Sequence, residues 1–212
     1  MRITAKARDA RTIVWRGRKL LSFAGCDYLG LAHHGAVVAA ARACLVRDGV
    51  SAGASRTTSG THEEHVGLER ELAAFLGREA CALLPDGSLA DLAVLRALEG
   101  EHQGAAIDVD AHPALVDAAR ASGFALEAYS PGMPLQGRSL VLTDGVYPMA
   151  GRAADVPALL ATLSGERARL VVDDSHGLGV LGARGRGVTE GVTDARLVLT
   201  GSLSKALGAG GG

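Results

Sequence analysis

The feature that most constrains the fold is a series of short apolar runs that alternate with helical patterns. The runs cover residues 80–84, 104–109, 125–129, 139–143, 168–173 and 196–200. They show no alternation of apolar and polar residues, which is typical of parallel strands buried on both faces. Residues 88–98, 113–122 and 155–163 have the periodicity of helices. The sequence therefore predicts an α/β fold with an open, mostly parallel sheet and helices on both faces.

The N-terminal part of the chain has a different pattern. Residues 12–15 and 19–23 flank a turn at Arg16 and Gly17, which predicts a hairpin, and residues 34–48 predict a helix. Thr61, followed three residues later by Glu64, predicts a capping box that opens a helix ending at Gly77. We expect an N-terminal segment over residues 1–50 and a larger domain over residues 51–212.

The composition excludes several classes of protein. Hydrophobic residues make up 48% and charged residues 21% of the chain, and the net charge is -1. Such a chain is globular and lacks the basic footprint of a nucleic-acid or membrane-surface binder. It contains no long apolar run for a transmembrane span or a signal peptide. The three scattered cysteines, Cys26, Cys44 and Cys81, fit reduced thiols. We therefore expect a cytoplasmic protein.

Lysine is rare in this chain, which has only three lysines against 19 arginines. One of them, Lys205, follows the last predicted strand within the glycine-rich sequence Gly-Ser-Leu-Ser-Lys-Ala-Leu-Gly. Arginine cannot form a Schiff base or lose its proton near neutral pH, so a lysine in this setting indicates a chemical role. The alternative is an ordinary surface lysine.

Three further groups of polar residues stand at predicted strand ends or helix starts. Asp173 ends one strand and His176 follows it, Gly87 and Ser88 open a helix, and His112 lies between a strand and a helix. Each group also has a structural interpretation: a turn, a serine N-cap on a helix, or a histidine that only satisfies the backbone. In an open α/β sheet, however, the carboxyl ends of the strands gather the active groups.

Together these residues predict a site for pyridoxal phosphate. This cofactor needs a lysine, a carboxylate for its pyridine nitrogen, a partner for its phenolic oxygen, a flat group on its ring and a phosphate cup. The residues that would meet these needs, in that order, are Lys205, Asp173, His176, His112 and the pair Gly87 and Ser88.

Longer segments carry a resemblance to a known family. They are Asp27-Tyr-Leu-Gly-Leu-Ala-His-His, Ser55-Arg-Thr-Thr-Ser-Gly-Thr-His, Leu68-Glu-Arg-Glu-Leu, Asp173-Asp-Ser-His-Gly-Leu-Gly and Gly201-Ser-Leu-Ser-Lys. From about residue 15 onward the chain resembles the α-oxoamine synthase group of fold-type I pyridoxal-phosphate enzymes. The first two segments most resemble the member that condenses L-alanine with pimeloyl-CoA in biotin biosynthesis.

The resemblance implies a function and a role for each residue. The enzyme would be a homodimeric acyltransferase that condenses an amino acid with an acyl-CoA and releases the carboxylate. Lys205 would form the Schiff base and remove the Cα proton, and Asp173 would hold the pyridine nitrogen. His176 would bind the phenolic oxygen and His112 would stack on the ring. The two serines near the phosphate would be Ser202 and Ser204.

The chain also departs from the family pattern. Cys26 replaces an asparagine, Pro148 and Ala150 replace a serine and an aspartate, and Ser88 stands where an aromatic residue is common. These changes imply kept cofactor chemistry and altered substrate recognition. The resemblance covers an N-terminal part of such an enzyme, so we expect these 212 residues alone to be inactive and poorly soluble. Alternatives are a pyridoxal-phosphate binder without turnover and another fold-type I aminotransferase.

Three other motifs point elsewhere but lack their context. The glycines of Gly177-Leu-Gly-Val-Leu-Gly match a dinucleotide fingerprint, yet Asp-Asp-Ser-His separates them from the strand. Ser202-Leu-Ser-Lys matches an acylase motif without its companions. His62 and His65 are three residues apart, whereas a zincin helix spaces its histidines by four. The sequence therefore predicts no metal site.

Overall fold

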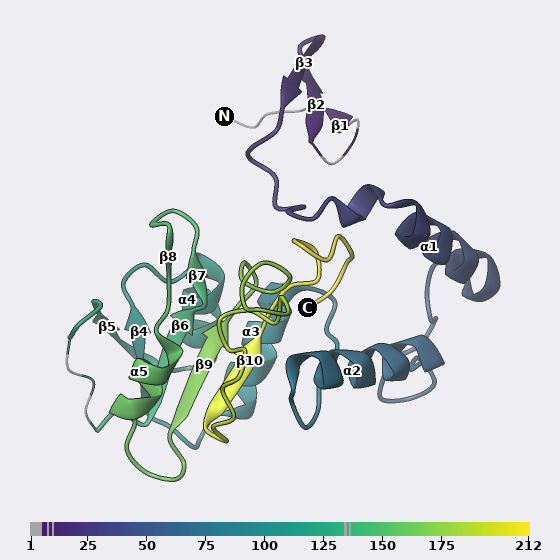
Figure 1. Ribbon diagram of the computed structural model, residues 1–212. Helices are drawn as coiled ribbons and strands as arrows, with labels where there is room; N and C mark the ends of the chain where they lie inside the picture. The colour runs from purple at the N-terminus through teal and green to yellow at the C-terminus, as the bar shows by residue number, and fades with distance from the viewer. Residues whose placement is uncertain (1–5, 8, 10, 134, 136) are drawn as a thin grey trace. The chain divides into compact units, whose positions relative to one another are not determined.

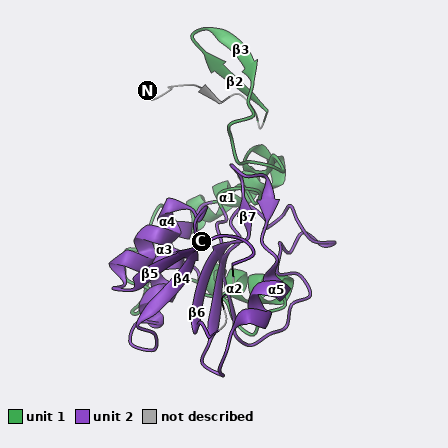
Figure 2. Ribbon diagram, turned by 90° about the vertical axis from the view of Figure 1, so that its left-hand side faces the viewer, with its two compact units in different colours: residues 1–82, 204–209 green, residues 83–203, 210–212 purple. Residues whose placement is uncertain are grey.

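The computed structural model describes residues 6–7, 9, 11–133, 135 and 137–212. It divides into two compact units, shown in different colours in Figure 2. The first unit comprises residues 1–82 and 204–209, and the second comprises residues 83–203 and 210–212. Among the described residues, no helix is both long and apolar enough to cross a membrane. The domain division expected at residue 50 stays a prediction.

The second unit is built on a five-stranded sheet (Figure 1). Its strands are β4 (Gly104–Asp108), β5 (Ala125–Tyr129), β6 (Leu140–Asp144), β9 (Arg169–Asp173) and β10 (Leu197–Thr200). The strand order is β10-β9-β6-β4-β5, and every neighbouring pair is parallel. The predicted parallel α/β fold is confirmed.

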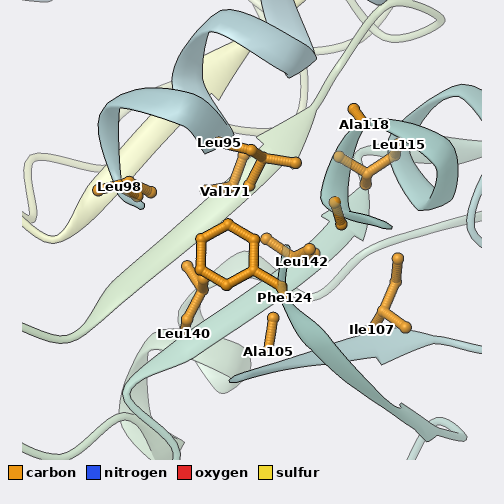
Figure 3. Close-up of a cluster of buried hydrophobic side chains, with 11 residues drawn as sticks. Leu95, Leu98, Ala105, Ile107, Leu115, Ala118, Phe124, Leu140, Leu142 and Val171 are labelled. Carbon is orange, nitrogen blue, oxygen red and sulfur yellow. The ribbon is translucent and has the colours of Figure 1, made fainter. Parts of the chain in front are cut away.

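Helices cover both faces of this sheet, as predicted. Neighbouring strand residues point to opposite faces, so Leu142 and Val141 enter different apolar clusters. One cluster joins the sheet to α3 (Gly87–Ala97) and α4 (Pro113–Ala121), and Figure 3 shows its leucines around Phe124. The other cluster joins the opposite face to α5 (Val156–Thr162).

The parallel register places the carboxyl ends of the strands at one edge of the sheet. Asp173 of β9 lies opposite Asp144 of β6 on one side and opposite Thr200 of β10 on the other. Asp108 of β4 lies opposite Tyr129 of β5. The polar residues that end these strands therefore share one edge of the second unit.

The first unit begins with an antiparallel sheet of three strands, β1 (Lys6–Ala7), β2 (Thr12–Trp15) and β3 (Arg18–Leu21). The predicted hairpin is β2 and β3, and β1 adds a strand that the sequence did not reveal. A short 3-10 helix, η1 (Leu31–His33), is followed by α1 (Gly35–Asp48) and α2 (Glu63–Leu76). The helix α2 ends at Gly77, as predicted, in the left-handed conformation with φ 66°.

Two local predictions need correction, and one small hairpin was missed. The predicted strand over residues 80–84 does not form: Leu84 pairs with Gly212, but the segment is not part of a continuous ladder, which a strand needs. The capping box is shifted by one residue: the Thr61 hydroxyl donates to the Arg56 carbonyl, so His62 becomes the N-cap of α2. A small hairpin of β7 (Val146–Tyr147) and β8 (Arg152–Ala153) was not predicted.

Candidate functional site

Asp173 occupies the carboxyl end of β9 at the shared edge of the sheet. Its side chain is half-buried, and Oδ1 accepts a hydrogen bond from the Ser175 amide over 3.0 Å. Its backbone carbonyl accepts from the Gly145 amide over 2.7 Å. The carboxylate is therefore held on one oxygen, while its other oxygen makes no hydrogen bond with the described residues. This leaves an acceptor at the edge where the parallel strands end.

His112 combines a structural role with its predicted one. Its Nδ1 accepts from the Ala114 amide over 3.1 Å, which caps α4, and its own amide donates to Asp144 over 2.9 Å. The capping bond fixes the ring orientation at the start of the helix, and the side chain stays exposed. The structure therefore shows the structural role, and stacking on a cofactor ring stays a prediction.

Gly87 and Ser88 lie at the start of α3, next to the segment that follows β10. A Cβ added to Gly87 would lie only 3.1 Å from the Cβ of Ser202, which is buried. The N-cap of α3 is Asp86, whose Oδ1 accepts from the Leu89 amide over 2.9 Å, and not Ser88. The structure thus brings Gly87, Ser88 and Ser202 together within the second unit.

A buried hydrogen bond that sequence reasoning missed connects the same two segments. The Thr200 hydroxyl at the end of β10 donates to Oδ1 of Asp91 in α3 over 2.6 Å, and both residues are buried. The bond holds α3 against the strand that leads to Ser202. The sequence signal was an aspartate between Ala90 and Leu92, on a helix face that is otherwise apolar.

The second missed residue is Asp174, whose side chain is fully buried directly after β9. Its Oδ2 accepts from the Val188 amide over 2.7 Å. Burial raises the pKa of this carboxyl to about 7, against the lowering effect of the Val188 bond, and the nearby charge of Asp173 also raises it. Nothing in the sequence separates Asp174 from its neighbour Asp173.

Lys205 and Ser204 belong to the first unit, whereas the other predicted site residues belong to the second. The Lys205 carbonyl accepts from the Gly208 amide over 3.0 Å. Gly208 has φ 66°, and a Cβ added there would lie 2.3 Å from the amide nitrogen of Ala32. The turn after Lys205 is therefore packed against η1, and the predicted approach of Lys205 to Asp173 stays a prediction.

A cavity of about 560 Å³ lies on the α5 side of the sheet near the ends of β4, β5 and β6. Arg152 lines it, with its guanidinium 3.5 Å from the centre of the Tyr147 ring, and donates to Asp108 and Asp110 over 2.8 and 2.9 Å. Burial raises the pKa of Tyr129, at the same cavity, to about 12. None of the predicted cofactor residues lines this cavity.

Two groups of side chains resemble metal ligands, and members of both already make hydrogen bonds within the protein. Asp48, His62 and Glu64 lie close enough to share an ion, but Arg47 donates to both carboxylates. Nδ1 of His65 accepts from the His62 amide over 3.1 Å. The histidine pair therefore caps α2.

Comparisons with known proteins show which family the chain belongs to. A family model described as aminotransferase class I and II matches residues 18–212. The chain is 40% identical to the 8-amino-7-oxononanoate synthase of Methylobacillus flagellatus over 208 residues, covering 92% of this chain and 52% of the relative. It is likewise 40% identical to that of Pseudomonas aeruginosa over 211 residues, covering 94% and 53%. The chain thus spans about half the length of these relatives.

Solved structures are similar along almost the whole chain. Serine palmitoyltransferase from Sphingomonas wittichii has a TM-score of 0.87 and 26% identity, over 97% of this chain and 55% of that one. The 8-amino-7-oxononanoate synthase of Francisella tularensis has a TM-score of 0.78 and 25% identity, over 89% and 56%. These likenesses confirm the resemblance to the α-oxoamine synthase group. Since the family model covers nearly all of the chain, this chain belongs to the aminotransferase class I and II family.

Proposed function

We propose that the protein is a pyridoxal-phosphate-dependent acyltransferase that condenses an amino acid with an acyl-CoA and releases the carboxylate. The observation that carries the proposal is the single edge of the second unit that gathers Asp173, His112 and the contact between Gly87 and Ser202. L-Alanine and pimeloyl-CoA are the first substrates to test, because relatives at 40% identity are 8-amino-7-oxononanoate synthases.

The residues of the second unit fit the cofactor in charge and shape. Asp173 has a second carboxylate oxygen that would accept from the protonated pyridine nitrogen, and this contact would keep the ring cationic. The amides at the start of α3, with Ser88 and Ser202, suit an anionic phosphate. When bound, the cofactor supplies an electron sink for charge that develops on the substrate α carbon.

Lys205 supplies the amine of the proposed site. It would hold the cofactor covalently and, once the substrate amine has displaced it, take the proton from the substrate α carbon. His176 would donate to the phenolic oxygen, and the His112 ring would cover one face. We expect the protein to act as a homodimer in the cytoplasm.

A second candidate function is cofactor binding without turnover. Three departures from the family pattern favour it: Cys26, Pro148 and Ala150. Pro148 and Ala150 are exposed in the turn between β7 and β8, and Cys26 is half-buried in the first unit. If these positions contribute to substrate recognition, cofactor binding survives their replacement while condensation does not.

The decisive experiment separates binding from turnover. The protein is mixed with pyridoxal phosphate, reduced with borohydride and digested, and the labelled peptide is identified by mass spectrometry. We expect the label on Lys205, its loss in Lys205→Ala, and no loss in Lys19→Ala, which changes an exposed lysine of β3. A label distributed over all lysines contradicts the proposal.

Turnover is then measured as CoA release from a panel of acyl-CoA thioesters with different amino acids. Release that needs both substrates and disappears in Lys205→Ala supports the acyltransferase. A specific label on Lys205 without CoA release from any pair supports the second candidate function instead.

A further inference from the structure

The carboxylate of Asp174 lies where three separate segments of the second unit meet. A Cβ added to Gly145 or Gly177 would lie 2.3 or 2.0 Å from its Oδ1, and one added to Gly187 would lie 1.8 Å from its Oδ2. Bare backbone therefore packs directly against the carboxylate on three sides. The segments are the turn after β6, the turn after β9, and the chain just before Val188.

Asp174 also closes a loop. Residues 175–187 leave the end of β9 and return, and the bond from the Val188 amide to Oδ2 joins the two ends. The backbone carbonyl of Asp174 accepts from the amides of Gly177 and Leu178, each over 3.0 Å. Asp174 therefore bonds to both ends of loop 175–187: its backbone carbonyl binds the first turn, and its carboxylate binds the Val188 amide that follows the loop.

This loop carries or contacts two segments of the proposed cofactor site. His176 is its second residue. Leu178 is buried, and its Cδ1 would lie 2.4 Å from a Cβ added to Gly201, the residue that precedes Ser202. The loop therefore packs on the start of the segment that leads to the proposed Schiff-base lysine.

We propose that Asp174 is a positioning residue, whose carboxylate clamps loop 175–187 so that His176, Gly201 and Ser202 stay at the carboxyl edge of the sheet. Its importance for catalysis rests on the proposed function, whereas the clamp itself does not. The side chain acts through its hydrogen bond to Val188 and through its shape in the glycine-lined space. Asp173, one residue earlier, faces the same edge and is the residue expected to contact the cofactor.

The clamp is tested by hydrogen exchange of the cofactor-free protein. In Asp174→Ala we expect the Val188 amide to exchange about tenfold faster or more, while the amides of β9 change little, because the loop opens locally. Asp174→Asn keeps an acceptor oxygen of the same size and should stay within about twofold of the unchanged protein. If Asp174→Ala does not fold, the effect of Gly145→Ala, which places a methyl group against Oδ1, decides the question in its place.

Two control variants separate the clamp from general destabilisation. Leu160→Ala removes a buried side chain of α5 and should speed exchange throughout the sheet without selecting Val188. Glu190→Ala removes the acceptor of the Arg184 and Arg186 amides and should loosen the middle of the loop only. Unchanged exchange at Val188 in Asp174→Ala, or equal loosening in Asp174→Ala and Asp174→Asn, overturns the clamp.

The link to the cofactor is read from the visible absorbance band of the protein with pyridoxal phosphate. We expect the band to shift or lose at least about half its amplitude in Asp174→Ala and to be kept in Asp174→Asn, since the band reports on groups near the ring. If the unchanged protein shows no band, the proposed function fails and hydrogen exchange still decides the clamp. If exchange rises while the band stays unchanged, the positioning role is overturned.

Discussion

The Thr200 hydroxyl donates a hydrogen bond of 2.6 Å to the Asp91 carboxylate between the end of β10 and the middle of α3. Both side chains are buried, so water does not replace the bond when one partner is removed. The contact joins α3 to β10. The first turn of α3 is predicted to bind phosphate, and β10 is the strand that precedes Ser202. It therefore provides a test of how strongly this part of the site is held.

Replacement of the Thr200 hydroxyl should be costly. We expect Thr200→Val to lower the free energy of unfolding by about 1–3 kcal/mol, because a buried carboxylate loses a donor at nearly constant volume. Thr162→Val removes a half-buried hydroxyl that donates to the Leu159 carbonyl and should cost less. Urea unfolding of the two variants gives the comparison, and equal losses would show that the Asp91 contact is not special.

Arg152 should contribute more to the free energy of unfolding than an arginine in an exposed ion pair does. It bonds to Asp108, whose side chain is only 3% exposed, so Arg152→Ala leaves a buried carboxylate without its cation. We expect a loss of about 1–3 kcal/mol in unfolding free energy. Arg138→Ala breaks an exposed pair with Glu127 and should cost less than about 1 kcal/mol. Similar losses in the two variants would contradict the buried pair.

Stability should fall as the pH rises toward neutrality, because of Asp174. Its pKa is about 7 in the folded protein and 3.8 without the fold, so folding favours the protonated carboxyl. That contribution is fully present below pH 4 and is lost as the pH rises through 7. Asp174→Asn should flatten the stability profile between pH 4 and 7.

A matched control for this profile is Asp194→Asn. The Arg196 guanidinium lowers the pKa of Asp194 to about 2, so its contribution is lost only as the pH falls below 4. Thermal unfolding between pH 4 and 8 should therefore show the same slope in this variant as in the unchanged protein. An unchanged slope in Asp174→Asn as well would show that Asp174 does not titrate there.

His112 offers a separation of its two roles. Because its side chain caps α4, we expect His112→Ala to cost about 0.5–2 kcal/mol in unfolding free energy, and His112→Asn to restore most of it. Asparagine lacks a flat aromatic ring, so His112→Asn should still weaken the binding of pyridoxal phosphate. Titration by absorbance measures this; full affinity in His112→Asn would leave His112 with the capping role only.

The sheet could be predicted because its signal is local and strong. Apolar runs such as 140–142 and 170–172 favour buried strands, and the helices between them favour a parallel register, which the structure has. Residues 80–84 have the same composition, but a strand also needs a neighbour along its whole length, and composition does not show this. The same limit applies to Thr61. Its hydroxyl donates to the Arg56 carbonyl, five residues earlier, and does not cap α2.

The site was predictable only where chemistry sets one residue apart from its surroundings. Lysine is rare in this chain, and Asp173 stands at a strand end, so both could be selected. Asp91 and Asp174 could not, because their importance depends on Thr200 and Val188, which are 109 and 14 residues away. The aspartate on the apolar face of α3 is a local signal at Asp91, but the neighbouring sequence does not show which distant residue it bonds to.

The close packing of Gly145, Gly177 and Gly187 on Asp174 makes these four positions depend on one another. While the acid is present, a methyl group at any of these glycines requires the Asp174 side chain or the backbone to move. Once a smaller residue replaces the acid, the three nearest contacts of a Cβ at Gly177 disappear. Gly187 still has φ 82°, and a Cβ at Gly145 would still lie 2.9 Å from Cγ2 of Val188. A change at Gly177 is therefore tolerated more readily after a change at Asp174 than before it, whereas Gly145 and Gly187 stay restricted by Val188 and by backbone conformation.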